Sequence, residues 1–296
     1  MADEAPFVSA IERFGDSLPV GFVAQGTPIR QFVFGGLKGK LRKELLNARN
    51  MYRETIVGLK HALAQLGPLQ PPPMSFVECI PACDAEYIQF LLSARRLKDG
   101  VFIIEVLCGD EDAGMVEGCG SALQAHVPAI NVGFIEGNTP IQYHPQSGLP
   151  FQEISFKYPL SNGAQADASV KYRVATLKDQ AEFVERAEAA AAVDRKKAGG
   201  GRRLRMGEFI FDQFASLMID FNGSGRGLTV EELENLDLDM LDAFTNAMGN
   251  YHPPHVDLDV DIVCGQCKRT QRVELPIKRW LDPFVVRMPS GSSPEM

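Results

Sequence analysis

The segment 255–277, HVDLDVDIVCGQCKRTQRVELPI, constrains the fold of this chain more than any other. Apolar residues at 256, 258, 260 and 262 alternate with Asp257, Asp259 and Asp261, the pattern of a strand with one buried face. Cys264 and Cys267 then bracket a tight turn, and alternating apolar residues in 270–277 predict a returning strand. We therefore predict a β-hairpin tipped by a C-x2-C pair, a shape typical of metal-binding knuckles and zinc ribbons.

The rest of the chain alternates between helical and strand patterns. Apolar residues at helical spacing predict helices over 7–14, 40–50, 52–66, 84–97, 177–195, 206–219 and 237–248. Short apolar or alternating runs predict strands over 31–34, 101–108, 154–158 and 170–174. Thr229 and Glu232 have the spacing of a capping box, which marks a further helix start. This mixture predicts an α+β fold.

The two halves of the chain follow the same order of elements. Each runs from a strand through helices to a helix led by an aspartate (Asp84 or Asp237), then a strand, then a cysteine. We predict two tandem, similar helix-plus-β-hairpin modules that arose by internal duplication, with a coincidentally shared α+β order as the alternative. The predicted division is an N-terminal arm (1–30), a first module with a Cys108/Cys119 hairpin (31–140), a second module with a Cys264/Cys267 hairpin (141–288) and a flexible tail (289–296).

Composition narrows the class of protein. The 296 residues carry a net charge of −8, whereas a general nucleic-acid binder is normally basic. The acidic N-terminus has no apolar run behind it, and the longest apolar runs are too short to cross a bilayer. Six cysteines are too few for a disulfide scaffold and suit thiols or metal ligands in a protein made in a cytoplasm.

Two sets of cysteines are candidate metal ligands. A strand over 101–108 is long enough to run back along a helix over 84–97, which brings Cys108 and Cys119 toward Cys79 and Cys83. His252, His255, Cys264 and Cys267 also have the spacing of a zinc set. An extended strand would hold His255 roughly 30 Å from Cys264, so Cys264 and Cys267 form the other set without the histidines. A structural zinc is therefore the one cofactor expected. The alternatives are that these cysteines are small buried apolar residues, or that the second hairpin is a relic that is stable without metal.

Enzymatic chemistry finds little support in the sequence, and we expect no catalytic or cofactor-binding residues. Asp257, Asp259 and Asp261 could bind a divalent cation, but an acidic face turned to water or a partner is the simpler interpretation. The histidines lack a recognisable nucleophile motif, and the loop at 223–227 lacks the G-K-[ST] of a phosphate-binding loop. A zinc-ribbon module on nucleic acid and a metal-dependent hydrolase remain the alternatives to a non-enzymatic protein.

Several short motifs together resemble one family, the baseplate hub and baseplate hub assembly chaperone proteins of contractile-tailed bacteriophages. The matching pieces are ATLKDQ at 175–180, LDMLD at 238–242, the Cys264/Cys267 hairpin and VELPI at 273–277, with looser versions at 36–40, 108–109 and 119–120. The chain departs from the family pattern in two places: ten residues separate Cys108 from Cys119, and no proline follows Cys264.

The resemblance implies a structural role. It places the protein in a virion, at the tail baseplate, or in the assembly of that structure in the host cytoplasm. Its expected partners are other hub, tube and spike proteins, with several copies in a symmetric assembly and with no membrane or nucleic acid.

Overall fold

The structure of the chain, a computed structural model, describes residues 9–37, 39–109, 119–137, 139–160, 162–197, 206–275 and 277. The predicted tail (289–296) lies outside these residues. The predicted α+β class is confirmed, since helices lie beside small sheets and every strand pairing in the described residues is antiparallel. No helix in this part of the chain combines the length and apolar composition needed to cross a membrane.

The first sheet has three strands in the order β1-β2-β3: β1 (Ser17–Ala24), β2 (Thr27–Phe34) and β3 (Leu63–Leu66). The predicted N-terminal arm (1–30) is wrong for its described part, which forms the short helix α1 (Ala10–Phe14), β1 and the start of β2. Strand β1 turns Leu18, Val20 and Phe22 into the core. Proline and glycine within β1 interrupt the apolar alternation that would have predicted this strand.

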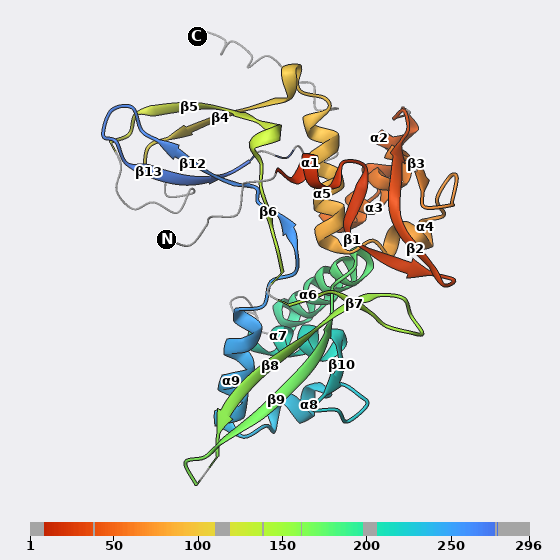
Figure 1. Ribbon diagram of the computed structural model, residues 1–296, viewed down its shortest axis with the longest axis vertical. Coiled ribbons are helices and arrows are strands. Elements are labelled where there is room, and N and C mark those ends of the chain that lie inside the picture. The colour runs from red at the N-terminus through yellow and green to blue at the C-terminus, as the bar shows by residue number, and fades with distance from the viewer. Residues whose placement is uncertain are drawn as a thin grey trace.

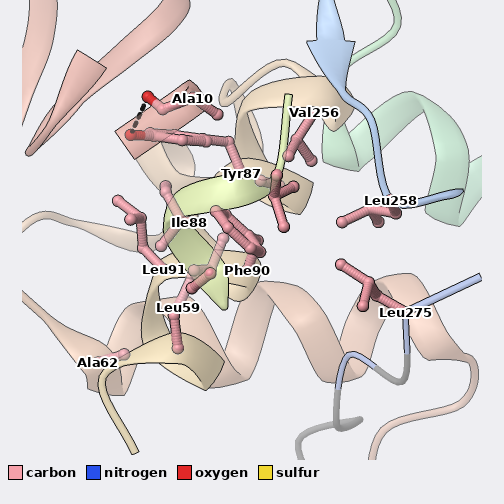
Figure 2. Close-up of a cluster of buried hydrophobic side chains, with 14 of the residues drawn as sticks. Ala10, Leu59, Ala62, Tyr87, Ile88, Phe90, Leu91, Val256, Leu258 and Leu275 are labelled. Carbon is pink, nitrogen blue, oxygen red and sulfur yellow. Dashed lines mark hydrogen bonds between the residues drawn. The ribbon is translucent and has the colours of Figure 1, made fainter. Parts of the chain in front are cut away.

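Four helices accompany this sheet: α2 (Lys40–Leu45), α3 (Met51–Ala62), α4 (Met74–Glu78) and α5 (Ala82–Ala94). Asn50 begins α3 by accepting hydrogen bonds from the backbone N–H groups of Tyr52 and Arg53 at 3.1 and 2.9 Å. In α5, the fully buried hydroxyl of Tyr87 lies 3.2 Å from the carbonyl oxygen of Ala10, which ties the helix to α1 (Figure 2).

Asp84 in α5 fixes β1 through two hydrogen bonds. Its carboxylate is completely buried and accepts from the backbone N–H groups of Val20 (2.9 Å) and Gly21 (2.6 Å). Gly21 adopts φ +71°, and a Cβ there would lie 2.7 Å from the carbonyl oxygen of Ile29, so this approach requires glycine. Burial raises the pKa of Asp84 to about 7, although the two N–H donors lower it.

The second sheet has the order β10-β9-β8-β7, with β7 (Gln142–Tyr143), β8 (Pro150–Pro159), β9 (Gln165–Arg173) and β10 (Met218–Phe221). Its helices are α6 (Leu177–Lys197), α7 (Met206–Leu217), α8 (Val230–Glu234) and α9 (Leu238–Gly249). The predicted capping box is confirmed at the start of α8. A core of its own fills this part of the molecule, with Phe156, Phe244 and Leu217 among its buried side chains.

The two sheets repeat one order of elements. In each, two antiparallel strands lead through two helices to a short third strand, which pairs beside the second. Two predicted helices were too long for the same reason: residues 63–66 and 218–219 belong to β3 and β10, where pairing with β2 and β9 overrides the helical spacing. A cysteine-bearing hairpin follows later in each half; duplication as the origin of this order stays a prediction.

The chain passes between the two parts on paired strands. Strand β6 (Phe134–Ile135) runs out and β11 (His255–Val256) runs back beside it in antiparallel pairing. This return places the second hairpin, β12 (Asp259–Val263) with β13 (Thr270–Glu274), next to the first hairpin, β4 (Val101–Leu107) with β5 (Ala122–Pro128) (Figure 1). The larger core therefore contains side chains from both predicted modules; Leu258 and Leu275 face each other beside the side chains of α5 (Figure 2).

Candidate metal centre

Two β-hairpins, one from each half of the chain, form a ribbon that ends in a cluster of cysteines. Both predicted hairpins are confirmed, with seven and five paired residues in β4–β5 and β12–β13 respectively. Their inward faces are apolar and bury Ile104, Leu123, Ile262 and Val273. Because each strand alternates, the intervening side chains face outward, and among them Arg272 lies 3.1 Å from Asp259.

Each hairpin carries two cysteines just beyond its paired strands, where backbone hydrogen bonds hold them. Cys108 directly follows β4, and its N–H donates to the carbonyl of Ser121 at 2.9 Å. Cys264 directly follows β12, and its carbonyl accepts from the N–H of Lys268 at 3.0 Å. Lys268 adopts φ +61°, a left-handed conformation that closes the turn within the C-x2-C knuckle. The two turns thus present Cys108 with Cys119, and Cys264 with Cys267, at the same end of the ribbon.

The four Sγ atoms converge on one point. All of them lie within 4.8 Å of one another, and cross-hairpin distances are 3.5 Å for Cys108–Cys267 and 3.7 Å for Cys119–Cys264. In a tetrahedral ZnS4 site, Zn–S bonds of about 2.3 Å separate neighbouring sulfurs by ~3.8 Å. An iron–sulfur cluster distributes its cysteines over several irons and would spread the sulfurs further. The donor set therefore fits a single tetrahedral ion.

Local hydrogen bonds prepare some of these thiols to act as thiolates. The Ser121 hydroxyl, 3.0 Å from the sulfur of Cys119, and the Ser121 backbone N–H lower the pKa of Cys119 to about 6. The backbone N–H of Cys267 lowers the pKa of Cys264. For Cys108, the backbone N–H of Cys119 lowers the pKa, but burial and the neighbouring thiols raise it to about 12. A bound cation would take the place of the protons that these neighbouring sulfurs carry.

A buried glutamine joins the two hairpins just below the cysteines. Gln271 on β13 is 1% exposed, and its amide lies 3.3 Å from both the carbonyl of Leu107 and the N–H of Gly109. At the surface, the Gln266 side chain contacts the hydroxyl of Ser121. These bonds fix the relative position of the tips, and Lys268 and Arg269 add positive charge beside a site that would carry two negative charges with zinc.

The structure groups the predicted metal ligands differently from the sequence. Cys108 and Cys119 join Cys264 and Cys267, and the metal-capable group in the described residues includes neither Cys79 nor Cys83. The predicted set assumed that the strand after α5 runs back along the helix, but β4 extends away from it (Figure 1). Asp99 and Gly100, with φ of +60° and +64°, redirect the chain between α5 and β4.

The remaining candidates lie elsewhere. Cys79 ends α4 and Cys83 is buried in α5, and burial raises the pKa of both thiols. His252 and His255 lie beside each other, with ring centroids 6.1 Å apart, and the described metal-capable group contains no histidine. The signal that sequence reasoning missed was the pairing of the two hairpins: each pair of cysteines follows a strand and supplies half of a four-ligand site.

Comparison with known proteins adds no relative. The chain matches no protein-family model, no curated protein and no solved structure.

Proposed function

We propose that the protein is a non-enzymatic structural or assembly protein whose two halves are joined by a structural zinc ribbon. The observation that carries this proposal is the convergence of four cysteine sulfurs from two hairpins. Cys119 and Cys264 are 145 residues apart in the chain, and Cys108 and Cys267 are 159 residues apart. A metal bound there would link the segment after α9 covalently to the segment after α5. Its effect would be to hold a β-ribbon in a fixed position on the helical body.

The donor set favours zinc and a structural role. Four thiolates are soft ligands that suit zinc, whereas magnesium and calcium prefer oxygen. A catalytic zinc has three protein ligands and leaves a position open for water or substrate, whereas structural sites are closed by four. Cys108, Cys119, Cys264 and Cys267 would fill all four positions. The role proposed for the ion is therefore folding stability and shape, and the protein would act through interfaces.

We place this structural protein at the tail baseplate of a contractile-tailed bacteriophage. The support is the resemblance of its short motifs to baseplate hub and hub-assembly proteins, among them the Cys264/Cys267 hairpin beside an alternating acidic strand. In that setting its partners are hub, tube or spike proteins, and several copies act together. The ribbon would present a rigid, metal-fixed surface to them.

Metal analysis tests the zinc proposal. The protein, purified without chelators, should contain one zinc per chain, and X-ray absorption should show four sulfur neighbours at about 2.3 Å. Substoichiometric zinc that cannot be restored by adding zinc during refolding would overturn the metal proposal.

Proteomics of tail particles tests the baseplate proposal. Mature virions and tail-assembly intermediates, purified from cells that express the gene, should be compared by mass spectrometry. Presence in virions supports a resident structural protein, and presence in intermediates alone supports an assembly factor. Absence from both would overturn the baseplate role.

Two rival functions make different predictions. A zinc ribbon on nucleic acid should bind DNA tightly at physiological salt, yet the net charge is −8, and Asp259 and Asp261 lie on β12, which leads to the tip, with Asp257 just before it. A hydrolase should lose a measured turnover when these three aspartates are changed to alanine. The structural proposal expects no DNA binding and no turnover to lose.

A further inference from the structure

Positive charge and exposed apolar side chains coincide at the start of the first helical layer. The residues concerned, which we call the α2 knob, are Lys40, Arg42, Lys43, Leu46, Arg49 and Met51. Leu46 is 70% exposed and Met51 is 54% exposed, although both are large apolar residues. Arg42 and Lys43 point into solvent, and neither forms an ion pair within the described residues. Such a surface is unusual on a chain that is acidic overall.

A surface of opposite charge lies on α8 and α9. The α9 patch consists of Glu231, Glu234, Asp237, Leu238, Asp239 and Asp242. All six are exposed, Leu238 by 69%, and in the described part of the chain none of the five acids forms an ion pair. A groove of about 640 Å³ adjoins it, and its lining includes Asp239 and Asp242 together with Phe156, Ala243 and Ala247.

The knob and the patch cannot meet within one molecule. Helix α2 lies at the upper right of the molecule and α9 at the lower left, in different parts of the fold (Figure 1). We propose that they meet between molecules: the α2 knob of one copy docks on the α9 patch of a second copy. Arg42 and Lys43 face Asp239 and Asp242, and Leu46 enters the adjoining groove.

A second copy is the occupant that satisfies both surfaces at once. Each surface places unpaired charge around an exposed leucine, with opposite sign, so the chain carries both halves of one complementary contact. Because the two halves differ, the contact is head-to-tail and generates a ring or an open chain of copies. It deepens the proposed role as a multi-copy structural protein and rests on that proposal for its biological setting. It does not involve the ribbon or its metal.

Sedimentation velocity of the isolated full-length chain tests the contact. At about 0.1 M salt, where charges act over about 10 Å, the native chain should form oligomers as its concentration rises toward about 0.1 mM. At about 1 M salt, where that range falls to about 3 Å, it should dissociate. Arg42→Glu with Lys43→Glu should weaken association about tenfold or more, and so should Asp239→Lys with Asp242→Lys.

Charge exchange separates this contact from any other. A chain carrying all four substitutions should associate again, and the two defective variants should associate with each other when mixed. The control is Lys178→Glu with Arg186→Glu on α6, which changes the net charge equally and should leave association intact. Circular dichroism melts and zinc content, measured on each sample, confirm that the variants fold.

Three outcomes would overturn the proposal. The first is a native chain that stays monomeric at low salt. The second is a knob variant that fails to associate while the patch variant associates normally, which would mean that the knob serves another partner. The third is a four-fold variant that stays monomeric although it folds. None of these results bears on the zinc content or on the particle proteomics, so the two proposals fail separately.

Discussion

Replacing one ligand, Cys267, tests the metal centre most directly. Cys267 is exposed at the ribbon tip, so Cys267→Ser removes a thiolate without burying a new polar group. The fold of the helical body should persist, because Cys267 is not one of the buried side chains of the larger core. The expected loss is therefore in metal affinity and in the order of the ribbon.

The size of that loss follows from the ligand count. Structural zinc sites bind with an apparent free energy of about 10–16 kcal/mol, so one of four ligands contributes about 2.5–4 kcal/mol. This corresponds to a zinc affinity that is about a hundred- to a thousand-fold weaker. The measured value depends on pH, since binding must displace protons from the remaining thiols.

A competition titration with a chromogenic chelator gives the zinc affinity of each variant. The matched control is Cys79→Ser, which removes a thiol outside the cluster and should bind zinc as the native chain does. Hydrogen exchange adds a local readout, because the N–H groups of Cys108 and Cys264 are bonded within the tips and should exchange faster in Cys267→Ser. Equal zinc affinity in Cys267→Ser and the native chain would refute the assignment, as would a loss in Cys79→Ser.

Two further predictions concern oxidation of the four cysteines and the titration of Asp84. After zinc is removed, diamide can oxidise the thiols by accepting two electrons per pair. Disulfides should then join the hairpins as Cys108–Cys267 and Cys119–Cys264, whose sulfurs lie 3.5 and 3.7 Å apart. Peptide mapping that finds Cys264–Cys267 instead would contradict the cross-hairpin geometry. For Asp84, burial raises the folded-state pKa from 3.8 to about 7. At a pH between these two values, the folded chain therefore keeps a proton on Asp84 that the unfolded chain has lost. This group therefore stabilises the fold below pH ~4, and up to ~4 kcal/mol of that contribution is lost as pH rises through 7. Denaturant unfolding at several pH values should show this slope in the native chain and a flatter one in Asp84→Asn; identical slopes would show that Asp84 is not the titrating group.

Local patterns in the sequence were sufficient for most single elements. The alternation around Asp257, Asp259 and Asp261 predicted β12, and the Cys264/Cys267 turn predicted its hairpin. The helical spacing after Asp84 predicted α5, and the spacing after residue 177 predicted α6. These elements are long enough, or alternate strictly enough, for one periodicity to dominate.

Elements that depend on distant partners were not predicted correctly. Residues 63–66 continue the helical spacing of α3, yet they form β3 because β2 offers unpaired backbone groups at that edge. The predicted grouping of the metal ligands was wrong for the same reason, because it depends on contacts between distant parts of the chain. Cys264 shows nothing locally that identifies Cys119 as a partner 145 residues away. The pairing of β6 with β11 brings the two hairpins together in space. Each of these strands has only two residues, too few to give a sequence pattern.

The repeated order of elements gives the metal centre a particular consequence. Each half ends in a hairpin with two cysteines, and two cysteines cannot close a tetrahedral site. Because β11 returns the second hairpin to the first, each half completes the site of the other. The larger core has the same dependence, since Leu258 and Leu275 of the second half pack with residues of α5. A zinc bound at this site would therefore require both halves to be folded and in contact.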